Sequence, residues 1–425
     1  MAKIALLNIG SELLRGRTVN TNAAYMGETL IAAGYSVETT LVIHDDGPVI
    51  TEAIHRLLAG HDAVLVTGGL GPTKDDITKK VLLDIFGGEM VCHEPSLKRI
   101  EGYLARLNRP LLEHNRLQSF VPSSCEVLEN ERGTAPGMAF KVDGRALVSM
   151  PGVPFEMKWL MENKVIPWLK ELFPTGLLLS RVVRTAGIPE SRMAEKMESI
   201  EPNLDPRIDV AYLPSSDGTK MELKISGQPE ERAGMEAALD AAQGMVVDLF
   251  REYVYSLEDK SPDRLVAEWL MRERKTFGTA ESCTGGEIAA KLVKHSGVSS
   301  VLRGGVVAYM ASVKEAVLGV PAETIETHGI VSEAVAIAMA EGARRVLDAE
   351  YAVSITGIAE AAKDAPENER PQAWIGFSGP RGSVAMHIRL MWDRRVNIEV
   401  AANAALVFCL RQLKSVESDV RAATV

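Results

Sequence analysis

The feature that most constrains the fold is a regular alternation of strand-length apolar runs with segments of helical spacing over residues 3–86. The apolar runs cover residues 3–9, 36–44 and 63–67, and the helical segments cover residues 22–33, 49–59 and 77–86. This βαβαβ order is typical of a parallel sheet with helices on both faces. Ligands in such sheets bind at the carboxyl ends of the strands, so the polar loops that follow the apolar runs form the expected binding edge.

Three domains are predicted from the way this pattern changes along the 425 residues. An N-terminal α/β domain with a doubly wound, mostly parallel sheet is expected over residues 1–175. Short strands and two helices then predict a small α+β module over residues 176–256. A polar, proline-containing segment at 256–262 marks the next boundary. Beyond it, strands separated by helices predict a C-terminal α/β domain over residues 257–425.

The charge and the cysteine content exclude several classes of function. Asp and Glu outnumber Lys and Arg by 57 to 47, and the resulting net charge of −10 argues against a nucleic acid partner. The four cysteines form no CxxC pair, so neither a disulfide framework nor a zinc ribbon is expected. The chain shows no signal-peptide pattern and no run of about 18 apolar residues, so no membrane partner is expected. We expect a cytoplasmic protein that acts on a small molecule.

The loop after the apolar run at 63–67 is the main candidate site in the N-terminal domain. Its glycines let the backbone approach a ligand closely, and the free N–H groups of the helix that follows favour phosphate. The candidate phosphate-binding residues are Gly68, Gly69, Gly71 and Thr73. Asp75 and Asp76 lie in the first helical turn, where one of them is a candidate ligand of Mg²⁺. The alternative interpretation is a tight strand–helix turn without a ligand.

Small polar residues also separate a predicted strand from a helix in the C-terminal domain, in the segment TAESCTGG at residues 279–286. A hydroxyl of Ser282 or Thr284 lies there over free helix N–H groups, which bind phosphate or stabilise an oxyanion. A hydroxyl nucleophile needs a base, and Lys314 supplies one if its pKa is lowered. Tyr309 is a candidate for relaying the proton or orienting the base. The alternatives are a capped helix for the segment and a solvated helix face for Lys314.

The N-terminal clusters resemble the molybdopterin-binding (MoaB/MogA-like) domain of the CinA, or competence/damage-inducible, family. That family shows G-x-E-L-L, D-T-N, G-G-L-G-P-T-x-D-D, N-x-x-G-T-A-P-G and P-G-x-P-x-E-M in this order. All are present over residues 10–157, except that Asn20 stands where Asp is usual. The resemblance implies a site for a phosphorylated nucleotide or pterin, with Asn22 and Thr134 among its contacts.

The same resemblance implies further properties of the N-terminal and middle regions. In some members it implies Mg²⁺-dependent ADP-ribose pyrophosphatase activity, which here makes Glu12, Asp75 and Asp76 the candidate metal ligands. It implies a KH-like fold for the middle module, which we interpret as structural rather than RNA-binding because the chain is acidic and lacks an evident GxxG clamp. Members of the family are usually dimers, so a homodimer is expected.

The C-terminal segment resembles the nicotinamide-nucleotide amidase domain of this family, which carries T-x-E-S-x-T-G-G, G-G-x-V-x-Y-x-x-x-x-K and a G-D-R before the last helix. The resemblance implies hydrolysis of the carboxamide of nicotinamide mononucleotide to nicotinate mononucleotide and ammonia. It gives catalytic roles to Ser282, Lys314 and Tyr309. The substrate-binding residues that it implies are Thr284, Gly285, Gly286, Thr356 and Arg394.

The chain departs from this pattern in the C-terminal domain. Ala311 stands where Asn is common, residues 360–363 replace a Gly-Pro-Gly-Gly run, residues 370–374 replace K-P-x-G-T, and Trp392 replaces the Gly of G-D-R. Side chains at such positions hinder the approach of a ligand to the backbone. Two interpretations remain open, an enzyme with amidase and pyrophosphatase sites and a non-catalytic nucleotide- or pterin-binding scaffold. A third, molybdenum-cofactor transferase, rests on fold analogy alone.

Overall fold

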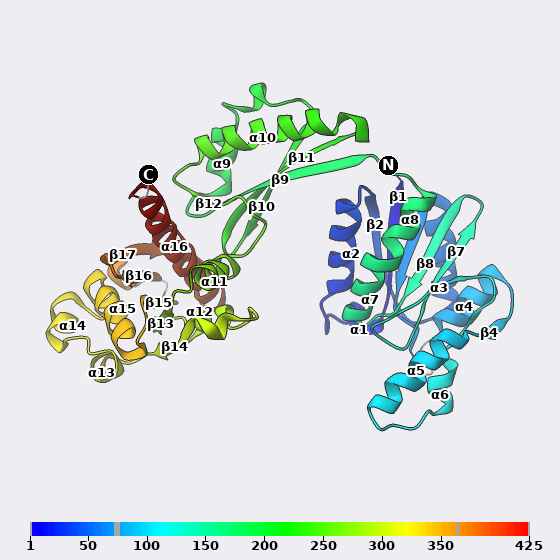
Figure 1. The fold of residues 1–425 in the computed structure, drawn as a ribbon, viewed down its shortest axis with the longest axis horizontal. Coiled ribbons are helices and arrows are strands. Elements are labelled where there is room, and N and C mark those ends of the chain that lie inside the picture. The colour runs from blue at the N-terminus through cyan, green and yellow to red at the C-terminus, as the bar shows by residue number, and fades with distance from the viewer. Residues whose placement is uncertain (1, 72–76, 363–364, 424–425) are drawn as a thin grey trace. The chain divides into compact units, whose positions relative to one another are not determined.

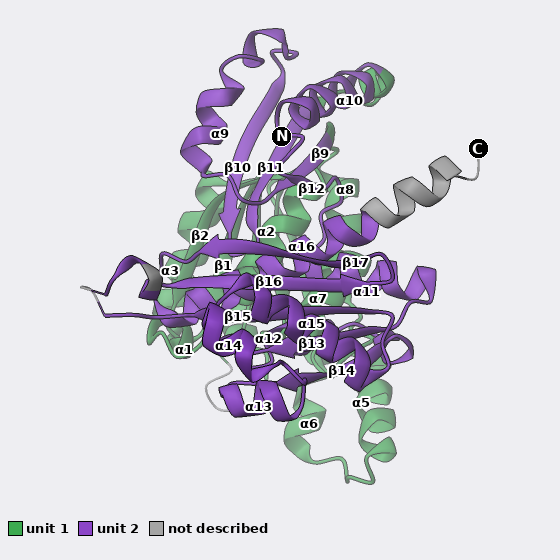
Figure 2. Ribbon diagram, turned by 90° about the vertical axis from the view of Figure 1, so that its left-hand side faces the viewer, with its two compact units in different colours: residues 1–178, 226–233 green, residues 179–225, 234–425 purple. Residues whose placement is uncertain are grey.

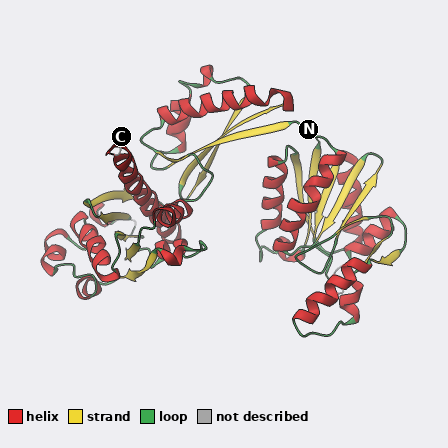
Figure 3. Cartoon of the chain, viewed as in Figure 1, coloured by secondary structure: helices red, strands yellow, loops and turns green. Residues whose placement is uncertain are grey.

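The computed structural model describes residues 2–71, 77–362 and 365–423, which form two compact units (Figures 1 and 2). Unit 1 comprises Met1–Leu178 and Ser226–Ala233, and unit 2 comprises Leu179–Ile225 and Gly234–Val425. Both units combine helices with strands (Figure 3), so the predicted α/β fold class is confirmed.

Unit 1 is built on a six-stranded sheet with the strand order β2-β1-β3-β8-β7-β6. The four strands from β2 to β8 run parallel, and β7 is antiparallel to both of its neighbours, β8 and β6. The predicted doubly wound, mostly parallel sheet is therefore confirmed. Its strands are β1 (Lys3–Ile9), β2 (Ser36–Ile43), β3 (Ala63–Thr67), β6 (Glu126–Leu128), β7 (Gly137–Val142) and β8 (Arg145–Met150).

Helices cover both faces of this sheet because side chains along each strand alternate between two cores. Leu6 of β1 packs in the core shared with α2, α7 and α8, whereas Leu7 packs in the core shared with α3 and α4. The helices are α1 (Ser11–Leu14), α2 (Thr21–Ala32), α3 (Gly47–Gly60), α4 (Thr78–Phe86), α5 (Glu94–Arg106), α6 (Glu113–Leu117), α7 (Pro154–Leu160) and α8 (Ile166–Leu172). A separate two-stranded sheet contains β4 (Met90–Cys92) and β5 (Phe120–Pro122).

The region predicted as one helix over residues 155–172 contains a π-helical turn, η1 (Met161–Val165), between α7 and α8. Pro167 lies just after this turn. Proline has no N–H, and its ring clashes with the carbonyl four residues earlier in a regular α-helix. The wider π turn accommodates the proline, and Val165 and Leu169 on either side of it remain fully buried.

The middle of the chain forms a four-stranded sheet with the order β10-β11-β9-β12. This small α+β arrangement agrees with the predicted KH-like module, and its strands are longer than the sequence pattern indicates. The strands are β9 (Leu177–Thr185), β10 (Ile208–Ser215), β11 (Gly218–Gly227) and β12 (Val254–Ser256). The helical elements are α9 (Glu190–Met197), η2 (Glu201–Asn203), η3 (Pro229–Glu231) and α10 (Arg232–Leu249).

The C-terminal part of unit 2 contains a five-stranded sheet with the order β14-β13-β15-β16-β17, in which the first three strands are parallel. One face packs against α11, α12 and α16, and the other packs against α15. The strands are β13 (Phe277–Glu281), β14 (Leu302–Val307), β15 (Tyr351–Ile358), β16 (Gln372–Gly379) and β17 (Gly382–Arg389). The helical elements are α11 (Pro262–Glu273), α12 (Glu287–Leu292), η4 (Val298–Ser300), α13 (Ala311–Ala316), α14 (Ala322–His328), α15 (Glu333–Leu347), η5 (Glu367–Glu369) and α16 (Arg394–Ala423).

One stretch of α16 is apolar enough to resemble a membrane span. Among the described residues, the helical segment Arg394–Lys414 alone has the length and hydropathy for it, and 61% of its apolar window is buried. Ala402, Leu406 and Cys409 on this helix belong to the core beneath the five-stranded sheet. Its apolar composition therefore reflects packing inside unit 2.

Candidate functional site

The carboxyl edge of the unit 1 sheet contains a cavity of about 760 Å³. Its wall brings together residues from separate predicted clusters, namely Glu12, Gly68, Gly69, Gly71 and Thr134. Asn22 lies at the margin, where its Nδ2 donates a hydrogen bond to the carbonyl of Gly152, a residue of the wall, at 2.7 Å. Loops that are distant in sequence thus meet at the edge where the sheet topology predicts a ligand.

Two of the glycines are required by the backbone itself. Gly68 has a φ of +106°, and a Cβ added there would lie 2.1 Å from the carbonyl oxygen of Ile9. Gly69 has a φ of +67°, and its added Cβ would lie 2.0 Å from Thr78 Oγ1. Both the left-handed conformation and the close approach exclude a side chain. The wall of the cavity at this point is bare main chain, which suits contact with phosphate oxygens.

We expect Gly68→Ala to destabilise unit 1 by about 2 kcal/mol or more, because strained backbone and a steric clash act together. The measurement is hydrogen exchange followed by mass spectrometry, read on peptides from β1 and β3. Gly60→Ala is the matched control, since no atom lies within 4 Å of its added Cβ. Equal protection in the two variants would contradict the assignment of a strict glycine requirement at residue 68.

Only one of the three predicted metal ligands, Glu12, is among the residues that the structure describes. Thr73, Asp75 and Asp76 lie outside the described residues, which leaves Glu12 in the wall of the cavity. No group of three or more His, Cys, Asp or Glu side chains in the described part of the chain is arranged to hold a metal ion. Of the three predicted ligands, the described residues thus contain only Glu12, and the mechanism derived below for unit 2 uses no metal.

Glu156 is a buried carboxyl in the cavity wall that the sequence analysis did not assign to the site. Burial raises its pKa above the usual range, and a hydrogen bond donated by Asn130 Nδ2 to Glu156 Oε2 acts in the opposite direction. Gly133 packs against this carboxyl, because a Cβ added there would lie 2.0 Å from Glu156 Cδ. The signal in the sequence was the P-G-x-P-x-E motif. A carboxyl of this kind is a candidate proton donor or acceptor.

In unit 2, the structure brings Ser282 and Lys314 together. The Ser282 N–H donates to the carbonyl of Ile355 at 3.0 Å, which fixes the serine beside the carboxyl end of β13. Lys314 is fully buried, and its Nζ lies 3.0 Å from Ser282 Oγ. Nζ also donates to the carbonyls of Ala308 at 2.6 Å and Tyr309 at 3.4 Å. A neutral amine has two N–H groups and a lone pair, so it can keep both carbonyls while accepting the serine proton.

Burial shifts the pKa values of Lys314 and Cys283, the two titratable groups next to Ser282, in opposite directions. Burial lowers the pKa of Lys314 from 10.5 to about 8, because desolvation disfavours the ammonium form. Burial raises the pKa of Cys283 to about 11, since it disfavours the thiolate. Cys283 also packs in the core under the sheet. At mildly alkaline pH, Lys314 therefore supplies a base, whereas Cys283 is a protonated packing residue.

Glu281 is a buried carboxylate that organises the loop around Ser282. It accepts hydrogen bonds of 2.8–3.2 Å from the hydroxyls of Thr279 and Thr284 and from the backbone N–H groups of Ile288 and Ala289. From the sequence, the N–H groups at the start of this helix were expected to bind phosphate or an oxyanion. For these two N–H groups that expectation is corrected, because the Glu281 carboxylate occupies them.

We expect Glu281→Gln to destabilise the segment over residues 281–292 by about 1–3 kcal/mol, because the amide cannot accept at both of its termini and leaves a buried donor unpaired. The measurement is amide hydrogen exchange of peptides covering that segment. Glu287→Gln is the control, since the Glu287 side chain is partly exposed and 3.8 Å from Lys291 Nζ. Unchanged protection in Glu281→Gln would show that the four hydrogen bonds do not hold the loop.

The remaining predicted residues of unit 2 lie in three different settings. Tyr309 and Arg394 are exposed and in contact, with Arg394 Nη2 donating to the Tyr309 hydroxyl at 3.1 Å. Thr356 is buried, and its hydroxyl donates to the carbonyl of Ile330 at 2.8 Å. Gly285 and Gly286 form the turn into α12 with φ values of +63° and +104°. Contacts thus run from Ser282 through Lys314 and Tyr309 to Arg394.

Arg394 also lines a cavity of about 470 Å³ at the start of α16, together with Glu287, Arg395, Ile398 and Glu399. The turn before this helix is fixed by Asn397, a fully buried residue that the sequence analysis missed. Its side chain donates to the carbonyls of Ala359 and Trp392 and accepts from the Trp392 N–H. Trp392, a departure from the family pattern, is thereby linked to Ala359, the residue before the altered run at 360–363.

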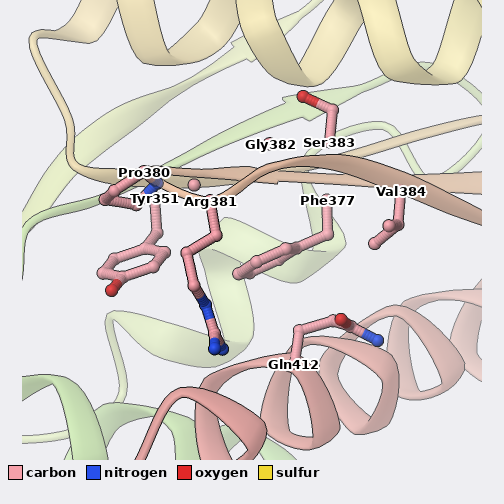
Figure 4. Close-up of a pocket in the computed structure, with 9 residues that line it drawn as sticks. Tyr351, Phe377, Pro380, Arg381, Gly382, Ser383, Val384 and Gln412 are labelled. Carbon is pink, nitrogen blue, oxygen red and sulfur yellow. The ribbon is translucent and has the colours of Figure 1, made fainter. Parts of the chain in front are cut away.

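A different cavity of unit 2, of about 310 Å³, is lined by Tyr351 at the start of β15 and by the turn between β16 and β17 (Figure 4). Tyr351 and Phe377 contribute their rings to its lining, and the side chain of Arg381 extends between them toward Gln412. None of the predicted site residues lines it. The predicted site residues of unit 2 therefore do not belong to this cavity.

The fold and these contacts define a class, an α/β protein with a glycine-lined cavity in one unit and a buried serine–lysine pair in the other. Three family models match successive regions of the chain. Residues 5–171 match the probable molybdopterin binding domain, residues 180–256 match the damage-inducible protein CinA KH domain, and residues 259–413 match the CinA C-terminal domain.

Relatives match over almost the whole chain. A CinA-like protein from Cytophaga hutchinsonii is 35% identical over 97% of this chain and 98% of its own length. A putative competence-damage inducible protein from Acetivibrio thermocellus is 34% identical over 92% and 93% of the two chains. The solved structure of the protein CinA from Thermoplasma acidophilum is 35% identical and covers 40% of this chain and 98% of its own, with a TM-score of 0.36. The chain belongs to the CinA, or competence/damage-inducible, family.

Proposed function

We propose that unit 2 hydrolyses the carboxamide of nicotinamide mononucleotide to nicotinate mononucleotide and ammonia. The observation that carries the proposal is the 3.0 Å contact between Ser282 Oγ and the buried Nζ of Lys314, whose pKa is lowered to about 8. A hydroxyl next to a neutral amine base is the arrangement that activates a serine nucleophile. The exposed guanidinium of Arg394, linked to the same site through Tyr309, suits the substrate phosphate.

In the proposed mechanism, Ser282 Oγ attacks the carboxamide carbon while its proton passes to Lys314 Nζ. The carbon–nitrogen bond then breaks as Lys314 returns the proton to the departing nitrogen, which leaves as ammonia. Water attacks the resulting ester on Ser282, and its proton passes through Lys314 back to Ser282 Oγ as nicotinate mononucleotide is released. Each step uses the same short Ser282–Lys314 contact, so one base serves both halves of the reaction.

The test is incubation of the full-length protein with nicotinamide mononucleotide, with ammonia and nicotinate mononucleotide quantified separately. Equal amounts of the two products would support the amidase. Absence of both would contradict it and favour the alternative of a nucleotide- or pterin-binding scaffold, since residues 360–363 and Trp392 depart from the family pattern.

We further propose that the cavity of unit 1 binds a phosphorylated nucleotide or pterin. The bare main chain at Gly68 and Gly69 and the buried carboxyl of Glu156 support this. The reaction that the family resemblance suggests is hydrolysis of ADP-ribose to AMP and ribose 5-phosphate, with Mg²⁺ as cofactor. The test is AMP formation from ADP-ribose with and without Mg²⁺. Tight pterin binding without AMP formation would replace this reaction with a binding role.

A further inference from the structure

In the first turns of α16, two oppositely charged side chains have the spacing of an ion pair but do not form one. Arg395 and Glu399 are four residues apart on this helix, a spacing at which opposite charges usually interact. Instead, Glu399 Oε1 accepts a hydrogen bond from the hydroxyl of Ser216 at 2.7 Å. The guanidinium of Arg395 makes no hydrogen bond or ion pair with any residue that the structure describes. Glu399 is therefore paired with Ser216 and not with Arg395.

Ser216 belongs to the middle module, in the turn between β10 and β11, and lies 183 residues before Glu399 in the sequence. Its hydroxyl also accepts a hydrogen bond from Asn403 Nδ2 at 3.0 Å, so its orientation is fixed from both sides. The contact belongs to a wider attachment along α16. Farther along that helix, Arg411 donates to the carbonyl of Tyr253 at 2.9 Å and Lys414 donates to that of Tyr255 at 3.1 Å.

Arg394, Arg395 and Glu399 all line the cavity at the start of α16, so the contact between Ser216 and Glu399 affects which charges this cavity offers to a ligand. Guanidinium groups bind phosphate through paired N–H donors, and a neighbouring carboxylate competes for the same donors. A Glu399 carboxylate held by Ser216 does not compete. The guanidinium groups of both Arg394 and Arg395 are then available to a phosphate in the cavity, whereas an ion pair with Glu399 would occupy that of Arg395.

We propose that Ser216 of the middle module is a positioning residue for the phosphate of the nucleotide substrate, because it holds Glu399 apart from Arg395. This inference rests on the proposed amidase only for the identity of the nucleotide. The middle module then contributes to substrate affinity. The site is expected to prefer phosphorylated nucleosides over free nucleosides. Arg395 becomes a phosphate-binding residue beside Arg394.

The experiment measures the dissociation constant of nicotinate mononucleotide for the full-length protein by calorimetry. This probe is the product, so binding is read without turnover. We expect Ser216→Ala to weaken binding about two- to three-fold, because an exposed ion pair at this spacing competes only weakly. Ser215→Ala is the matched control, since the Ser215 hydroxyl donates to Asp217 and to the carbonyl of Gly218 but not to Glu399. Affinity for nicotinic acid riboside, which lacks the phosphate, should be the same in wild type and Ser216→Ala.

The double variant Ser216→Ala/Glu399→Gln separates positioning from a merely structural role. Glutamine cannot form the competing ion pair, so we expect the Ser216→Ala effect to disappear in the Glu399→Gln background. An equal loss of affinity in both backgrounds, no loss in Ser216→Ala, or no binding of the probe by wild type would each overturn the inference. If the variants bind the probe as expected but the wild-type protein releases no ammonia, the proposed amidase activity is contradicted and the role of Ser216 is not.

Discussion

Ser282→Ala is expected to lower the rate of ammonia release from nicotinamide mononucleotide by roughly 10³-fold or more, because the nucleophile is lost while the binding residues remain. The measurement is a comparison of kcat for wild type and variant at saturating substrate. Since Ser282 is buried and small, its replacement by alanine leaves the packing largely intact. The dissociation constant for nicotinate mononucleotide should therefore change little.

The matched control for this variant is Cys283→Ala. Cys283 is the next residue, but its thiol is buried in the core and its pKa is raised to about 11. We expect this variant to keep most of the activity. The reverse pattern, with activity in Ser282→Ala and none in Cys283→Ala, would assign the nucleophile to the thiol and contradict the proposed mechanism.

Lys314→Met is expected to lower kcat/KM by roughly 10²- to 10⁴-fold, because the general base is removed. The wild-type enzyme should show a matching pH dependence. The neutral amine is the active form, so activity should fall about tenfold per pH unit below the pKa of about 8 and level off above it. Any residual activity of Lys314→Met should lack this inflection.

Lys294→Met is the control for Lys314→Met, because Lys294 is exposed and lies in the same domain. It should keep both the rate and the inflection near pH 8. An unchanged inflection in Lys314→Met would assign the titrating group to another residue. Folding of both variants is checked by their thermal unfolding midpoints, since Lys314 also donates to the carbonyl of Ala308.

Local patterns in the sequence predicted most of the fold and the centre of each candidate site. The alternation along β1 and β3 follows directly from burial on both faces of a parallel sheet. Gly68 and Gly69 stood out because glycine is needed wherever φ is positive and backbone approaches backbone. Ser282 was recognisable from its place between a strand and a helix. Its pairing with Lys314 was inferred from residue chemistry, and the 3.0 Å contact agrees with it.

The features that the sequence did not predict depend on contacts between distant segments. Glu281 reads as one more strand residue until β13 is seen to bring its carboxylate to the N–H groups of α12. Glu156 stands in the P-G-x-P-x-E motif, but only its burial, which raises its pKa, makes it a candidate proton donor or acceptor. The contact between Ser216 and Glu399 joins segments 183 residues apart, so no local pattern indicates it. The π turn before Pro167 follows from a known rule, but apolar periodicity cannot detect it.

The division of the chain into two compact units, each with its own hydrophobic cores, has a consequence for how the protein evolves. A substitution that erodes one site leaves the core residues of the other unit unchanged, because the described hydrophobic cores of the two units share no residue. Natural selection can therefore relax on one activity while it maintains the other. The altered residues 360–363 and Trp392 beside an intact glycine-rich cavity are the kind of uneven divergence that such independence permits.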